Sequence, residues 1–114
     1  MGKDASEDVD YDAALERLRA ECAGWPGVTE ATSWGNPTFK ANGRGFAVLD
    51  RYKGRCCIYV QCGGGRRAAL LAQEGWFAAP YDKKQQAACR LLDGLEWDEF
   101  LPVLRESYER VMPG

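Results

Sequence analysis

The strongest short hairpin signal in the chain lies in the stretch Phe39-Lys40-Ala41-Asn42-Gly43-Arg44-Gly45-Phe46, which predicts two antiparallel strands joined by a tight turn. The two central residues of a type I′ turn need positive φ, and the Asn-Gly pair supplies the residue types that tolerate it best. A two-residue loop at this position makes Ala41 face Arg44. In the same register Phe39 faces Phe46, so we expect the two rings to form a buried cross-strand pair on one face of an antiparallel sheet.

Further strands are expected after this hairpin. The strand that begins at Arg44 puts Val48 on the same face as the two phenylalanines. A turn over residues 50–54 leads into a segment of alternating positions, in which Cys56, Ile58 and Val60 oppose Cys57, Tyr59 and Gln61. Three antiparallel strands are the simplest account of this region, and residues 87–92 suit a further strand or a helix equally well.

Helical patterns lie on either side of these strands. Apolar side chains recur at helical spacing over residues 11–22, with Asp8 and Asp10 as candidate caps. A short helix is expected over residues 66–73 and an amphipathic one over residues 97–111.

These elements predict one domain. We expect a single α+β unit over residues 1–114, in which N- and C-terminal helices flank an antiparallel sheet and residues 1–9 form a loose segment. No apolar run approaches the ~20 residues that cross a bilayer, and the acidic N-terminus is unlike a secretory signal. The chain is therefore expected in the cytoplasm, without membrane contact. Its oligomeric state is left open, with a monomer favoured.

The composition excludes several kinds of chemistry. The 114 residues contain no histidine, which excludes histidine-based nucleophile activation and histidine metal ligands. The five cysteines form no C-x-x-C pair, and Cys56 and Cys57 are adjacent in a predicted strand, so their side chains point to opposite faces. We expect reduced thiols, no bound metal, no cofactor and no catalytic residue.

Charge is unevenly distributed along the chain, although the net charge is only −2. Residues 40–90 carry 10 basic and 3 acidic side chains, whereas residues 1–39 carry 3 basic and 8 acidic ones. Residues 91–114 carry 2 basic and 6 acidic side chains. A basic middle between acidic ends is typical of a binding face for a polyanion, and ordinary solvated charges are the alternative interpretation.

Five stretches of the chain resemble, in the same order, the MmcQ/YjbR family. They are Trp25–Glu30, Trp34–Lys40, Gly43–Leu49, Leu70–Tyr81 and Trp97–Val111. The resemblance implies a small bacterial α+β domain with a CyaY-like (frataxin-like) arrangement, a DNA-binding role and no enzymatic activity. The chain departs from the family at Gln85-Gln86, where relatives commonly carry an aromatic residue after two lysines.

The candidate nucleic-acid contacts are cations of the basic middle. Gly63-Gly64-Gly65 opens a predicted helix, so backbone N–H groups and the two arginines that follow could meet one phosphate. A flexible turn with two surface arginines is the alternative there, and Trp76 and Phe77 fit a core as well as a stacking surface. We expect weak, salt-dependent DNA binding. The predicted site consists of Lys40, Arg44, Arg66, Arg67, Lys83 and Lys84.

Two other functions remain open from the sequence. The acidic run from Asp4 to Glu21 could bind iron as in frataxin-like proteins, since hard cations prefer carboxylate oxygens. The acidic and basic faces could instead bind protein partners. The segment Thr32–Pro37 carries an indole but no base or metal that could activate a nucleophile, so we interpret it as a structural turn.

Overall fold

The computed structural model describes residues 2–80 and 82–112, which form three helices and one six-stranded antiparallel sheet. The helices are α1 (Gly2–Cys22), α2 (Gly64–Leu71) and α3 (Trp97–Val111). The strands are β1 (Thr29–Ser33), β2 (Asn36–Ala41), β3 (Arg44–Tyr52), β4 (Arg55–Gln61), β5 (Trp76–Ala78) and β6 (Ala87–Leu91). Their order across the sheet is β1-β2-β3-β4-β6-β5. None of the described helices combines the length and the apolar character that crossing a membrane requires.

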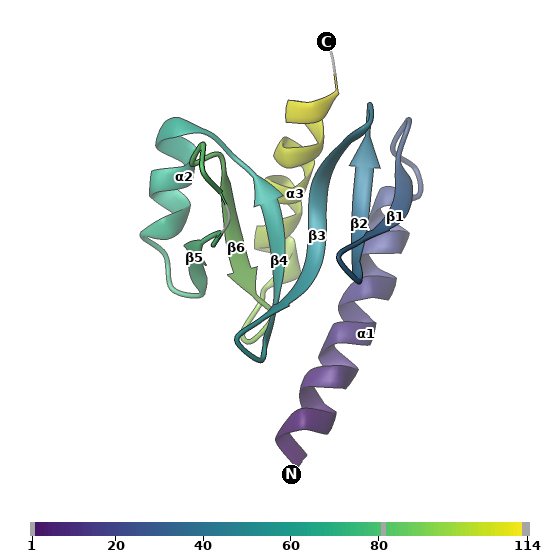
Figure 1. The fold of residues 1–114 in the computed structure, drawn as a ribbon, viewed down its shortest axis with the longest axis vertical. Helices are drawn as coiled ribbons and strands as arrows, with labels where there is room; N and C mark the ends of the chain where they lie inside the picture. Colours follow the sequence, from purple (N-terminus) through teal and green to yellow (C-terminus); the bar gives the residue numbers. More distant parts are fainter. Residues whose placement is uncertain (1, 81, 113–114) are drawn as a thin grey trace.

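The helices cover one face of the sheet and leave the other face without a helix. In Figure 1, α1 and α3 lie behind the sheet, and α2 stands beside the edge formed by β5 and β6. Leu18 of α1 and Leu104 of α3 belong to the main core, together with Phe46 and Ile58 of the central strands. A smaller apolar cluster on the helix-free face consists of Cys57, Ala79, Ala87 and Cys89.

The predicted hairpin is confirmed at its turn. Asn42 and Gly43 have φ values of 53° and 74°, as a type I′ turn requires. Ala41 pairs with Arg44, as predicted. The Asn42 side chain also donates a hydrogen bond to the Val111 carbonyl at 3.2 Å, which connects the hairpin tip to the end of α3.

A β-bulge changes the register beyond this turn. The predicted pairing of Phe39 with Phe46 is wrong, because Phe46 is an extra residue in β3 and Phe39 pairs with Ala47. Both phenylalanines are nevertheless buried in the main core on the helix side, as predicted. The prediction for Val48 is wrong, because the bulge shifts the alternation by one residue and puts this side chain on the helix-free face.

The buried hydroxyl of Ser107 fills the gap that the bulge opens. The pairing of β3 with β4 ends at Ala47 and Val60, so the Phe46 carbonyl and the Gln61 amide lack their ladder bond. Ser107 Oγ, fully buried on α3, donates to that carbonyl and accepts from that amide at 2.8 Å. One side chain thus satisfies backbone groups of two neighbouring strands.

The other predicted elements are present with changed bounds. The short and the C-terminal helix form as α2 and α3, and the segment that suited either structure forms strand β6. α1 begins at Gly2, so Asp8 and Asp10 do not cap it, and residues 2–9, expected to be loose, belong to it. The sequence does not predict β1, which is exposed at every position, or β5, which has only three residues.

Replacing Ser107 with alanine should lower the free energy of unfolding by about 2–4 kcal/mol, because two buried backbone groups lose their partner. Chemical denaturation measures this change. Ser33→Ala, at an exposed position of β1, is the matched control and should change the free energy by less than about 0.5 kcal/mol. A loss for Ser107→Ala no larger than that of the control would contradict the bridging role.

Cys22 should make stability depend on alkaline pH. Burial raises the pKa of its thiol from 9.0 to about 12. Because the folded pKa is the higher one, the thiol contributes stability that is present below pH 9.0 and is lost as the pH rises toward 12. In Cys22→Ala the free energy of unfolding should fall less steeply over this interval than in the wild type, as measured by denaturation at several pH values. Equal slopes would show that this thiol does not contribute.

Candidate nucleic-acid interface

The six predicted cationic residues gather at one end of the sheet. Lys40 on β2 pairs with Gly45 on β3, and the Gln61 side chain of β4 donates to the Gly45 carbonyl at 3.0 Å. Gln61 in turn pairs with Ala87 at the start of β6. The β2–β3 turn, the N-terminus of α2 and the loop between β5 and β6 all lie at the upper end of the view in Figure 1. We call this region the basic end, and its cations are Lys40, Arg44, Arg66, Arg67, Lys83 and Lys84.

Four of these cations have no carboxylate partner among the described residues. Arg44, Lys83 and Lys84 are exposed, and Lys40 is half-buried. Within the described part of the chain, no Asp or Glu oxygen lies within 4.0 Å of their charged nitrogens. Cations without a neutralising neighbour raise the local positive potential, which attracts a phosphate backbone.

Lys83 and Lys84 project from a loop that Asp82 holds in shape. The Asp82 carboxylate accepts hydrogen bonds from two consecutive backbone amides where β6 begins, at 2.9 and 2.7 Å. Gln86, part of the departure from the family pattern, accepts a hydrogen bond at its carbonyl from the Cys62 amide at 2.8 Å. The loop is thus connected to the end of β4 and the start of β6, so the two lysines stand on a fixed backbone.

Arg66 and Arg67 reach the basic end, but their charges are engaged by neighbours. Arg66 Nε lies 2.9 Å from a carboxylate oxygen of Glu106 on α3. Arg67 Nε donates to the Ala87 carbonyl at 2.9 Å and lies 3.7 Å from an Asp82 oxygen. These two arginines therefore connect α2 to its neighbours. They offer less charge to an anion than the four cations that have no carboxylate partner in the described part of the chain.

Arg110 is a further cation of this region that the sequence reasoning misses. It is exposed in the last turn of α3, and its guanidinium lies so close to Gly63 that a Cβ there would be 2.8 Å from Nη1. Gly63 is the N-cap of α2 and offers no side-chain cap to its amides. In the sequence, Arg110 is a cation near the C-terminus of a helix, and this position predicts that it stabilises that helix. It does not predict that Arg110 lies beside the N-terminus of α2.

The acidic residues do not form a metal site within the described residues. Glu21 and Glu16 lie 3.1 and 3.2 Å from Arg17 and Arg19, in the same helix. No group of three His, Cys, Asp or Glu side chains in the described part of the chain could hold a metal ion. All five cysteines are buried and free. The side chains of Asp4, Glu7 and Asp8 lie outside the described residues.

Trp76 and Phe77 contribute to packing. Trp76 stacks on Phe100 with the ring centroids 6.1 Å apart, and Phe77 stacks on Tyr52 at 5.8 Å. Both side chains are half-buried. Of the two interpretations that the sequence leaves open, the structure favours the core.

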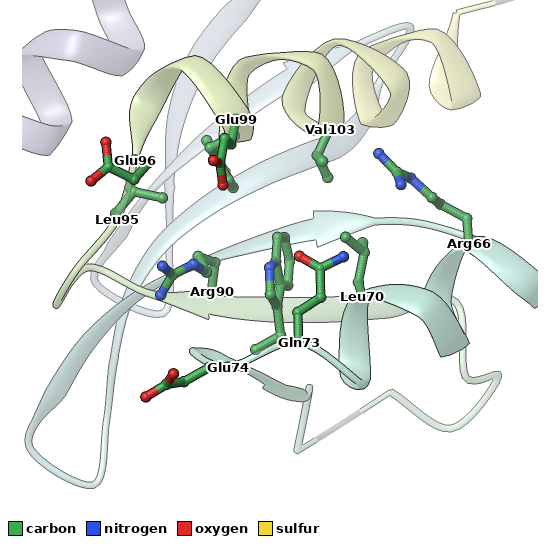
Figure 2. A pocket seen from close by; sticks show the side chains of 11 residues that line it. Arg66, Leu70, Gln73, Glu74, Arg90, Leu95, Glu96, Glu99 and Val103 are labelled. Atoms are coloured by element: carbon green, nitrogen blue, oxygen red, sulfur yellow. The ribbon is translucent and has the colours of Figure 1, made fainter.

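A pocket of about 220 Å³ lies between α2, β5 and α3. Figure 2 shows Arg90 in this pocket, with Glu99 pointing toward it from α3 and Arg66 on the opposite side. The Arg90 guanidinium donates to backbone carbonyls at 3.0 to 3.5 Å. These belong to Gly75, Leu91, Asp93 and Gly94. Arg90 therefore stabilises the surrounding backbone, and Arg66 is the residue that this pocket shares with the basic end.

The fold is similar to those of solved structures. The chain superposes on a protein from Pseudomonas syringae with a TM-score of 0.74 and 13% identity, over 85% of this chain and 97% of that one. It superposes on a Deinococcus radiodurans protein assigned to the DUF419 family with a TM-score of 0.73 and 19% identity, over 82% and 75% of the two chains. At these identities the likeness shows the fold alone, and it confirms the predicted α+β class. No curated protein matches the chain.

The sequence also matches a family directly. The pattern of the YjbR family matches residues 23–110. This range contains the whole sheet, α2 and most of α3, and with them the hairpin and the loop that form the basic end. The earlier resemblance is thereby confirmed, and the chain belongs to the YjbR family.

Proposed function

We propose that this chain is a cytoplasmic bacterial protein that binds DNA weakly and without sequence preference through the basic end, and that it is not an enzyme. The observation that carries the proposal is a set of four cations at that end for which the described residues provide no carboxylate partner: Lys40, Arg44, Lys83 and Lys84. DNA is the expected ligand because the family resemblance implies it and because such a cluster fits a polyanion.

The size of the cluster sets the expected strength of binding. Each cation that neutralises a phosphate adds about 0.9 to the slope of log K against log salt, so four give a slope of about −3.6. Non-specific binding of this kind has a Kd of roughly 10⁻⁴ to 10⁻⁶ M at physiological salt. The acidic parts of the chain oppose association if they face the DNA, so the basic end has to approach it first.

A protein-interaction module is the second candidate. A cleft between α1 and the segment that joins β6 to α3 is lined by four carboxylates, those of Asp10, Glu16, Asp93 and Glu96. The cation Arg17 and the apolar side chain of Trp97 also line this cleft. It fits a basic protein segment better than it fits a nucleic acid, and such a partner would co-purify with the chain.

Replacing Lys83 and Lys84 together with alanine should weaken binding to all DNA sequences alike and flatten the salt slope by up to about two units. Fluorescence anisotropy of a labelled duplex at several salt concentrations measures both quantities. The matched control is Lys53→Ala with Arg55→Ala, which removes two cations at the opposite end of β3 and β4. This control should leave the slope unchanged. Equal effects of the two double variants would mean that net charge alone matters, and no wild-type binding even at low salt would exclude the proposed function.

Removing the charge of Glu106 should strengthen binding. In Glu106→Gln the Arg66 guanidinium loses its carboxylate partner and becomes available to a phosphate, so the salt slope should steepen by up to about 0.9. Glu99→Gln makes the same charge change at the other end of α3 and should leave the slope as it is. If the two variants bind DNA equally well in the same anisotropy titration, Arg66 does not belong to the interface.

A further inference from the structure

The turn between β1 and β2 presents a tryptophan to solvent. Among the described residues, Trp34 is the large apolar side chain that is fully exposed, at 99%. Ser33 pairs with Asn36, so Trp34 and Gly35 form a two-residue loop. Trp34 has a φ of 53°, and a bulky aromatic residue in this left-handed conformation is sterically strained.

Two other hairpin turns in the chain provide an internal comparison. Asn42 and Lys53 occupy the same turn position with the same φ of 53°, and a glycine with positive φ follows each of them. The Asn42 side chain hydrogen-bonds to Val111, and the Lys53 ammonium lies 5.4 Å from the centroid of the Tyr52 ring. Within the described part of the chain, Trp34 has no hydrogen bond and no ring contact. Among the described residues, its side chain therefore makes no interaction that offsets the steric strain of the turn.

A residue that breaks a local rule without an intramolecular gain marks a functional position. Asparagine would suit the Trp34 position better, as it does in the β2–β3 turn, because asparagine tolerates positive φ. What tryptophan supplies in its place is a large, rigid π-surface. Since this surface is uncovered, it is available to a ligand.

The surroundings of Trp34 favour a nucleobase as that ligand. Residues 31–40 contain no acidic residue, and their one charge is that of Lys40. Trp34 lies at the end of β2 opposite to the basic end. Six residues of strand separate it from Lys40 by about 20 Å, a distance that a few nucleotides can span. Aromatic side chains stack on bases with little dependence on sequence, whereas the bases of an intact duplex already stack on each other.

We propose that Trp34 stacks on an unpaired base, so that the preferred ligand is single-stranded or locally unpaired DNA. The inference rests on the proposed function, because the cations of the basic end supply the phosphate contacts. The alternative, insertion of the indole into an apolar pocket of a protein partner, is an outcome of the test.

The test compares Trp34→Asn with the wild type on two probes, a ten-nucleotide oligo-dT and a hairpin duplex of equal length. Trp34→Asn should be at least as stable to denaturant as the wild type, because it relieves the strained turn. It should bind oligo-dT roughly five- to hundredfold more weakly, with an unchanged salt slope, because the substitution changes no charge. Its affinity for the duplex should stay within about twofold of the wild type. Trp34→Phe should keep part of the oligo-dT affinity, and oligo-dT should quench tryptophan fluorescence in the wild type but not in Trp34→Asn.

The outcomes separate the two proposals. Equal oligo-dT affinity of wild type and Trp34→Asn, without quenching, would overturn the stacking role while leaving duplex binding and the proposed function intact. Equal weakening on both probes, or a less stable variant, would also overturn it and point to a structural or protein-contact role for Trp34. If neither probe binds the wild type at low salt, the proposed function fails and the stacking role fails with it.

Discussion

The arrangement of β3, β4 and α3 depends on the two hydrogen bonds of the Ser107 hydroxyl. This hydroxyl replaces the ladder bond between β3 and β4 at the bulge, so the extra residue Phe46 can turn into the core without leaving unpaired backbone groups. The next residue, Tyr108, donates to the Pro26 carbonyl at 2.6 Å and contacts the ring of Phe46. The same helix accepts the Asn42 side chain at its end. α3 thereby fixes β3, β4, the β2–β3 turn and the segment after α1 relative to one another.

This fixed framework determines where the cations stand. Lys40 and Arg44 flank a turn that is connected to α3, and Lys83 and Lys84 lie in a loop whose backbone is held by Asp82. Little backbone freedom is then lost when these side chains contact phosphates, so the entropic cost of binding is small. The pairing of Arg66 with Glu106 has the opposite effect, since it uses a cation of the same region to hold α2 against α3.

The sequence predicts what local chemistry determines. The Asn42-Gly43 turn, the helix over residues 97–111 and the cationic middle can be read from residue types and spacing. The bulge cannot, because its stabilising partner lies 61 residues away at Ser107. The neutralisation of Arg66 escapes prediction for the same reason, since Glu106 is 40 residues distant in the chain. The exposure of Trp34 cannot be predicted from the sequence, because large apolar residues are expected in the core and no local pattern marks this one as exposed.

The proposed function requires that the basic end is the surface that contacts DNA. A titration of duplex DNA into the ¹⁵N-labelled protein, followed by the chemical shifts of backbone amides, locates that surface residue by residue. The predicted result is that shifts concentrate at residues 40–44 and 82–86, while residues 53–55 at the opposite end of β3 and β4 stay in place. Shifts centred on residues 53–55 or on α1, or no shifts at low salt, would contradict it.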